Sequence, residues 1–248
     1  SRRQRQMCIR DRYETVQSIL AKSGHINHKY LKESESDKKA VIVVTANRGL
    51  AGGYNSNITR MIIDEGFTKE NTVVYAVGKK GRELLERKGY EIKADYSEAI
   101  NDPIYKDAKE ICDDVLSAFA DGEVGEIYLA YTVFKNTVVH EPQLIRLLPV
   151  EADDAAHETD GSEALMTYEP SEEEALDMII PKYVCSLVYG ALIESVASEN
   201  GARMQAMDSA TSNAEEMIST PSLKYNRARQ ASITQELTEI IAGASAIS

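Results

Sequence analysis

Residues 40–58 read AVIVVTANRGLAGGYNSNI, and this stretch decides the fold class. Its first part, Ala40 to Thr45, is a continuous β-branched run that is apolar on both faces of an extended chain, as expected of a buried parallel strand. A glycine-rich loop follows over Ala46 to Gly53, and a helical pattern then runs from Tyr54 to Asp64. A strand, a tight loop and a helix in this order predict an α/β domain.

The same alternation continues along the chain to Val150. A second apolar strand is predicted at 72–77, helices at 79–88 and 103–120, and two long alternating strands at 126–134 and 138–150. The last two strands flank the short segment Lys135-Asn136-Thr137 and are expected to pair in antiparallel fashion. Strands that alternate with helices favour right-handed crossovers and hence a mostly parallel sheet.

The glycine-rich loop raises the question of a phosphate site, since a strand, glycines and a helix N-terminus can together cradle a pyrophosphate. Its glycines, Gly49, Gly52 and Gly53, are spaced G-x-x-G-G rather than G-x-G-x-x-G, and no Gly-Lys-Ser/Thr follows. The other interpretation is a tight turn that needs glycine for its backbone conformation and for close packing. We favour the structural turn and keep nucleotide binding as the alternative.

The C-terminal part of the chain is dominated by one helical pattern. Ser171 and Glu174 have the spacing of a capping box, and helical periodicity then runs from Lys182 to Ile247. A helix of that length is about 100 Å long at 1.5 Å per residue, which a compact domain of this size cannot enclose. Its apolar positions form a narrow stripe rich in small residues, which favours close packing against a partner helix in a coiled coil. Pro221 predicts a bend or break at 217–221.

Composition excludes several classes of function. The net charge is −12 and the hydrophobic fraction is 43%, so a folded core is expected and nucleic acid is not expected as the main partner. We find no run of about 18 apolar residues and therefore expect no segment that spans a bilayer. The three cysteines, Cys8, Cys112 and Cys185, are far apart in the sequence. Neither a disulfide framework nor a metal site is predicted.

Two blocks of the sequence resemble the gamma subunit of F-type ATP synthases, of bacterial type. The first block is NRGLAGGYNSNI, residues 47–58. The second comprises SENGARMQAMDSATSNAEEMI, residues 198–218, and YNRARQASITQELTEIIAGA, residues 225–244. The resemblance covers the chain from about Tyr13 to its end. Only a short helical pattern, at 13–20, stands where the family has a long N-terminal helix, so the resemblance suggests an N-terminally truncated member.

The resemblance implies a Rossmann-like domain and a long C-terminal helix that forms an antiparallel coiled coil with an N-terminal helix. The family acts as a rotor shaft, which turns inside a ring of alpha and beta subunits and couples ion flow through the membrane c-ring to ATP synthesis. The implied partners are the alpha, beta and epsilon subunits and the c-ring, at the cytoplasmic face of the plasma membrane, without direct bilayer insertion. The resemblance implies no catalytic residue, cofactor or metal, and it does not specify H⁺ or Na⁺ as the coupling ion.

Individual residues can be carried over where this sequence matches the family's motifs. Four match positions that contact the beta subunits: Arg229, Gln230, Thr234 and Glu236. Arg203 matches a basic position involved in coupling, and it is also spaced for an i,i+4 ion pair with Glu199. Tyr168 and Glu169 match positions of the foot that face the epsilon subunit and the c-ring. The other interpretation of each residue is a solvated helix face or strand end.

The predicted domain boundaries follow from these patterns. Residues 1–12 are rich in Arg and unlike the rest of the chain, and we expect them to be a foreign segment. The remainder divides into an N-terminal helix remnant at 13–30, the α/β domain at 31–169 with an acidic surface loop at 151–162, and the long helix at 170–248.

Two other functions fit parts of the same pattern. A small α/β enzyme would bind a nucleotide or phosphate at the loop 49–53, and tight nucleotide binding by the isolated chain would identify it. A self-associating coiled-coil scaffold would use its last helix, and co-purification with alpha and beta subunits would argue against it.

Overall fold

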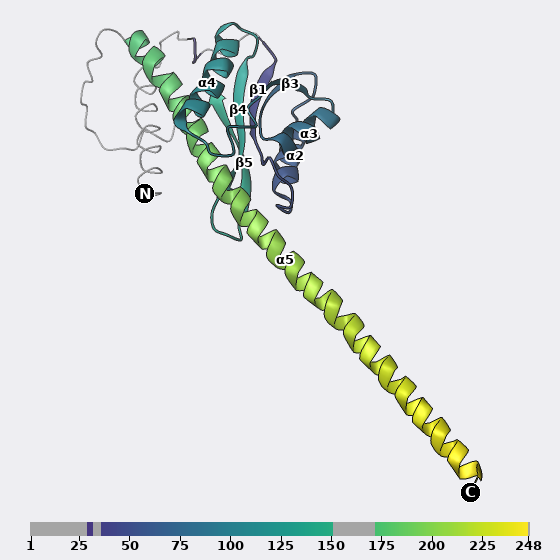
Figure 1. Ribbon diagram of the computed structural model, residues 1–248. Coiled ribbons are helices and arrows are strands. Elements are labelled where there is room, and N and C mark those ends of the chain that lie inside the picture. The colour runs from purple at the N-terminus through teal and green to yellow at the C-terminus, as the bar shows by residue number, and fades with distance from the viewer. Residues whose placement is uncertain (1–28, 32–35, 151–171, 248) are drawn as a thin grey trace, which may run out of the picture. The chain divides into compact units, whose positions relative to one another are not determined.

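The computed structural model describes residues 29–31, 36–150 and 172–247, in which five strands form one sheet (Figure 1). The strands are β1 (Lys39–Val44), β2 (Thr72–Val77), β3 (Glu91–Asp95), β4 (Glu126–Phe134) and β5 (His140–Leu148), and the helices are α2 (Tyr54–Asp64), α3 (Lys79–Arg87), α4 (Tyr105–Ala120) and α5 (Glu172–Ile247). Their order in the sheet is β3-β2-β1-β4-β5. All neighbouring strands are parallel except β4 and β5, which are antiparallel. The predicted α/β class with a long C-terminal helix is confirmed.

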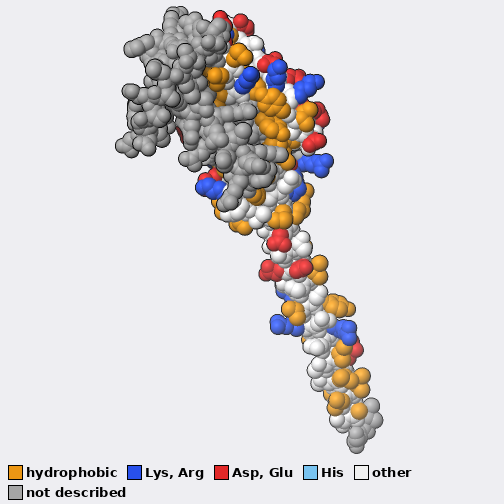
Figure 2. Space-filling model, turned by 90° about the vertical axis from the view of Figure 1, so that its left-hand side faces the viewer, with side chains coloured by type: hydrophobic (Ala, Val, Ile, Leu, Met, Phe, Trp, Pro, Cys, Tyr) orange, Lys and Arg blue, Asp and Glu red, His pale blue; other side chains and the backbone are white. Residues whose placement is uncertain are grey.

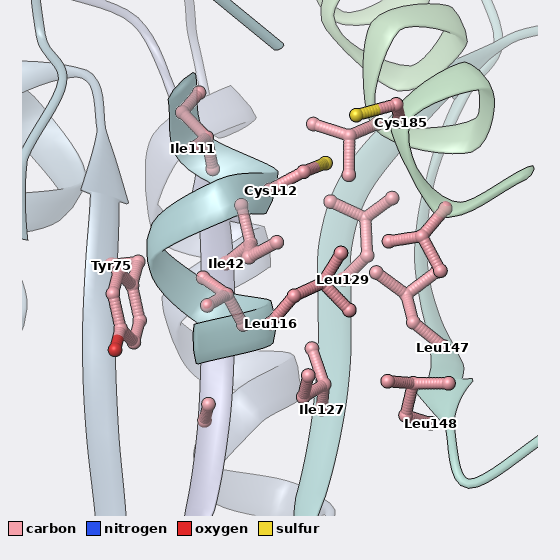
Figure 3. Close-up of a cluster of buried hydrophobic side chains, with 14 of the residues drawn as sticks. Ile42, Tyr75, Ile111, Cys112, Leu116, Ile127, Leu129, Leu147, Leu148 and Cys185 are labelled. Atoms are coloured by element: carbon pink, nitrogen blue, oxygen red, sulfur yellow. The ribbon is translucent and has the colours of Figure 1, made fainter. Parts of the chain in front are cut away.

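Helices cover both faces of this sheet. On one face, Ile58 and Ile62 of α2 and Leu85 of α3 pack in one cluster with every second residue of β1 and β2. On the other face, Ile111 of α4 and Leu176 of α5 belong to a larger cluster with the alternate residues of the same strands, part of which Figure 3 shows. The central strands therefore carry apolar side chains on both sides, which is why β1 shows no polar alternation.

The edge strand β3 is not predicted by the sequence pattern. Its residues, EIKAD, include three charged side chains, and their burial alternates between exposed and intermediate. Lys93 pairs with Glu123, and Asp95 pairs with Arg82. An edge strand has only one neighbour and is commonly marked by charged residues, so it lacks the apolar run by which a central strand is recognised.

The predicted break near Pro221 is wrong, because α5 is helical throughout 217–221 and beyond. An interior proline removes one N–H group and costs about 3 kcal/mol, but the hydrogen bonds of the turns on either side remain. One further bond forms next to it, where the Ser222 hydroxyl donates to the carbonyl of Ile218 at 2.9 Å. This part of α5 is exposed, so water can bind the carbonyl that the proline leaves unpaired.

The chain divides into two compact units, residues 1–203 and 204–248. In the first unit, α5 residues between Leu176 and Leu192 belong to the core of the α/β domain. In the second unit, every described side chain from Met207 to Ser245 is exposed.

Helix α5 bears on the expectation that no segment spans a bilayer. Between Leu176 and Ser245 it contains an 18-residue window, of mean hydropathy 1.5, that is long and apolar enough to cross a bilayer. Half of that window is buried inside the protein. The apolar residues there include Val184 and Val188, which pack in the core of the α/β domain.

Several predicted features lie outside the described residues. They are the Arg-rich segment 1–12, the helical pattern at 13–20, the acidic loop 151–162, and the foot residues Tyr168 and Glu169.

Candidate functional site

The glycine-rich loop after β1 is a hydrogen-bonded junction between several elements. Asn47 lies at its centre: its side-chain oxygen accepts from the backbone N–H of Lys79 at 2.9 Å, and its side-chain nitrogen donates to the carbonyl of Ser97 at 2.7 Å and to Asn101 Oδ1 at 2.9 Å. Asn55 Oδ1 accepts from the backbone N–H of Ala46 at 2.9 Å. The loop thus joins the ends of β1, α2 and α3.

The N-terminus of α3 is occupied by groups of the protein itself. Its second and third backbone N–H groups, those of Lys80 and Gly81, donate to the Ala46 carbonyl and to Thr45 Oγ1, each at 3.0 Å. The preceding Gly78 has φ of 124°, and a Cβ atom there would lie 2.1 Å from the Thr45 carbonyl oxygen. These N–H groups of α3 are already used within the protein and are not free to bind a phosphate.

Two buried hydrogen bonds tie α5 to this junction and to the sheet. The Tyr54 hydroxyl donates to the carbonyl of Ser195 at 3.1 Å. The Ser198 hydroxyl donates to the carbonyl of Thr132, in β4, at 3.1 Å. Burial raises the pKa of Tyr54 well above its usual value, so the phenol remains a neutral donor. Each bond is directional, and together they fix which face of α5 meets the sheet.

Arg203 lies beside the same loop. Its guanidinium contacts Glu199 at 2.6 Å, which confirms the predicted i,i+4 ion pair, and it donates to the carbonyl of Gly49 at 3.5 Å. Ala202 packs against Ala46 and Ala51 of the loop. The structure therefore places Arg203 where α5 contacts the glycine-rich loop, and its role in coupling stays a prediction.

The four residues expected to contact beta subunits lie in the second unit, within about two turns of α5. All four are exposed: Arg229, Gln230, Thr234 and Glu236. The Thr234 hydroxyl donates to the carbonyl of Gln230 at 2.8 Å. Residues three and four apart share a helix face, so Arg229 and Glu236 lie on either side of Ile233. The structure groups these polar residues around an apolar centre.

Large apolar side chains recur along the second unit (Figure 2). We call them the exposed stripe, and they are Met204, Met207, Met217, Ile218, Leu223, Tyr225, Ile233, Leu237, Ile240 and Ile241. Leu237 is 55% exposed and Ile240 is 68% exposed. Large apolar surfaces left open to water in this way are typical of sites that a partner protein covers.

Sequence reasoning missed the residues that hold α5 on the sheet. Tyr54 and Ser195 are 141 positions apart. In the sequence, Tyr54 reads as the first residue of a helix, and Ser195 and Ser198 read as small residues of a coiled-coil stripe. Only their i,i+3 spacing on one helix face gave a signal, and it does not identify the partner.

Comparison with known proteins gives a consistent result. The profile of a family described as ATP synthase matches residues 3–247. The ATP synthase gamma chain of Lachnoclostridium phytofermentans is 65% identical, over 95% of this chain and 83% of that protein. The sodium ion specific ATP synthase gamma chain of Acetobacterium woodii is 41% identical, over 94% of this chain and 83% of its own length.

Solved structures have the same fold. One is a chain of the central stalk and c-ring structure of the Tetrahymena thermophila mitochondrial ATP synthase, with a TM-score of 0.61 and 21% identity over 85% of this chain and 94% of that chain. Another, from the Euglena gracilis mitochondrial ATP synthase, has a TM-score of 0.60 and 18% identity over 99% of this chain and 94% of that chain.

Proposed function

The chain belongs to the gamma-subunit family of ATP synthases, and from this premise we propose that it is the central rotor shaft of an F-type enzyme. In this role it couples ion flow through a membrane c-ring to ATP synthesis at sites on other subunits, and it makes or breaks no bond itself. One relative is a sodium ion specific gamma chain and another is named without an ion, so membership of the family does not decide between H⁺ and Na⁺ as the coupling ion.

The exposed stripe is the observation that carries this proposal. Burying one large apolar side chain contributes about 1.5–3 kcal/mol, so a helix that leaves ten of them exposed needs a partner. The alpha and beta subunits are the proposed partners. Arg229, Gln230, Thr234 and Glu236 would then supply polar contacts to the beta subunits at the rim of an apolar surface.

The mechanism requires only differential binding. A helix whose faces differ in chemistry presents a different surface to each beta subunit at each angle, and it stabilises a different conformation of each. The α/β unit would form the foot, where Tyr168 and Glu169 face the epsilon subunit and the c-ring. The complex would place this subunit peripherally at the cytoplasmic face of the plasma membrane.

Binding to purified alpha and beta subunits tests the proposal. The chain is expected to co-purify with them as a stoichiometric complex, and Arg229→Ala is expected to weaken this binding about tenfold or more, because a charge-assisted hydrogen bond contributes about 1.5–3 kcal/mol. Lys224→Ala is the control, since it removes a positive charge from the same exposed helix outside the four proposed contacts. Failure of the chain to bind these subunits, or equal losses from both variants, would contradict the proposal.

A further inference from the structure

Gly201 is a buried glycine in the interior of α5, where glycine disfavours a helix. A Cβ atom at this position would lie 2.7 Å from Cε1 of His140 and 3.3 Å from Cε2 of Phe134. Neither distance leaves room for a methyl group without movement of the neighbour. The glycine therefore forms a notch in α5, into which the first residue of β5 fits.

The imidazole of His140 fills this notch through van der Waals packing. Both of its ring nitrogens are buried and have no hydrogen-bond partner among the described residues. Its ring lies beside that of Phe134, with the two centroids 5.9 Å apart. Burying polar nitrogens without hydrogen-bond partners costs free energy. The ring is therefore held in place by its packing against Gly201 and Phe134, and not by hydrogen bonds.

The notch lies on the same side of α5 as the two buried hydrogen bonds. Ser195, Ser198 and Gly201 follow one another at intervals of three residues, so each is a neighbour of the next on the helix surface, displaced by about 60° around the axis. Ser195 and Ser198 are fully buried, and their bonds reach α2 and β4. We call residues 195–203 the anchor, because they are the last part of α5 that contacts the α/β domain in this way.

The geometry points to the anchor as the contact that prevents α5 from rotating about its own axis on the α/β domain. The fit of His140 into the Gly201 notch sets the rotational angle of the helix. Adjacent residues of a helix are about 100° apart, so a turn by one residue would bring Asn200 or Ala202 against the imidazole. Neither side chain fits where the glycine leaves room. This inference rests on the proposed rotor function, because only a shaft that carries torque needs its angle fixed.

The variant Gly201→Ala tests the fit directly. Hydrogen exchange of the β4–β5 hairpin amides in the full chain is expected to become about tenfold faster, since the added Cβ displaces His140 and weakens local packing. Gly243→Ala is the matched control, because it makes the same change in the same helix at a position with no neighbour within 4 Å. Its hairpin is expected to exchange at the wild-type rate.

A double variant distinguishes a clash with His140 from a general loss of folding in the first variant. His140→Ala alone empties the notch and should also speed exchange, whereas the combination of Gly201→Ala with His140→Ala refills it and should restore exchange toward the wild-type rate. Additive losses in the double variant, or an unchanged hairpin in both single variants, would overturn the assignment of the notch.

The role in torque is measured in the assembled complex in vesicles. With Gly201→Ala we expect ATP hydrolysis to continue while the number of ions pumped per ATP falls about twofold or more, since the helix can slip between two packed positions. The double variant should recover this ratio. An unchanged ratio with a loosened hairpin would overturn the role of the anchor and leave the rotor function intact, whereas absence of pumping by the wild-type complex would count against the rotor function itself.

Discussion

Glu126, at the start of β4, lies between two basic side chains. Lys39 Nζ is 2.8 Å from its carboxylate and Arg146 Nη1 is 3.5 Å away. Burial by itself would raise the pKa of this carboxyl group, but the hydrogen bond and charge of Lys39 outweigh it and hold the pKa below its usual value. The group therefore links the stability of the α/β domain to pH.

We expect Glu126→Gln to lower the free energy of unfolding at pH 7 by about 0.5–1 kcal/mol, a modest value because the Lys39 and Glu126 side chains are 40% and 27% exposed. A lowered folded-state pKa stabilises the protein above the pKa of the unfolded carboxyl, about 4.3, and this contribution is lost as pH falls through the folded-state value. The difference between wild type and variant should thus shrink below about pH 4. Urea unfolding at pH 7 and pH 3.5 measures it.

The exposed Glu70 provides the control for this pH effect. Glu70→Gln removes one carboxylate without touching the Lys39 pair, and it should leave the free energy of unfolding within about 0.5 kcal/mol of wild type at both pH values. A constant difference between wild type and Glu126→Gln across the pH range would show that the pair does not carry the effect.

At the scale of single elements, helix α5 continues through Pro221, so its replacement should change stability rather than structure. We expect Pro221→Ala to stabilise this part of the helix by up to about 3 kcal/mol, because it restores one backbone hydrogen bond and removes a clash. Circular dichroism at 222 nm should show a higher melting midpoint and little change in helical content at low temperature.

Ser219→Ala separates the proline effect from simple helix propensity. It replaces an exposed serine two residues away, whose hydroxyl donates to the Glu216 carbonyl at 3.0 Å. Its gain should be no more than about 0.5 kcal/mol. Equal midpoints for the two variants would mean that the missing N–H group of Pro221 costs nothing in this helix.

Elements with one strong periodicity could be predicted from the sequence, and elements defined by their neighbours could not. The bounds of α2, β2 and β4 agree with the predicted ranges, because each carries an apolar pattern of the right period. Strand β3 depends on pairing with β2, and its charged sequence has no such pattern. The prediction of a break at Pro221 gave too much weight to the loss of one backbone hydrogen bond. The many hydrogen bonds that remain in a long helix keep it continuous.

The same distinction holds for the candidate site. The exposed stripe could be read from the helical spacing of Ile233, Leu237 and Ile240. The anchor could not, since Ser198 meets Thr132 and Gly201 meets His140 only after the sheet has formed. Contacts between residues so distant in sequence are set by topology, and no local pattern reports them.

At the scale of the whole molecule, the two units should differ in stability in the isolated chain. The described side chains from Met207 to Ser245 are exposed, and a helix without tertiary packing is marginal in water. Amides of residues 204–247 should therefore exchange about a hundredfold or more faster than those between Leu176 and Leu192, which are in the core. Hydrogen exchange followed by mass spectrometry gives both rates in one experiment.

The partner experiment completes this argument. Binding of alpha and beta subunits should slow exchange of 204–247 about a hundredfold, because it covers the exposed stripe, and should leave the 176–192 segment unchanged. Leu237→Gln should reduce this protection, since it places a polar group within the stripe. Strong protection of 204–247 in the isolated, monomeric chain would mean that the stripe is already covered within the chain, and the reason to assign it to partner subunits would be lost.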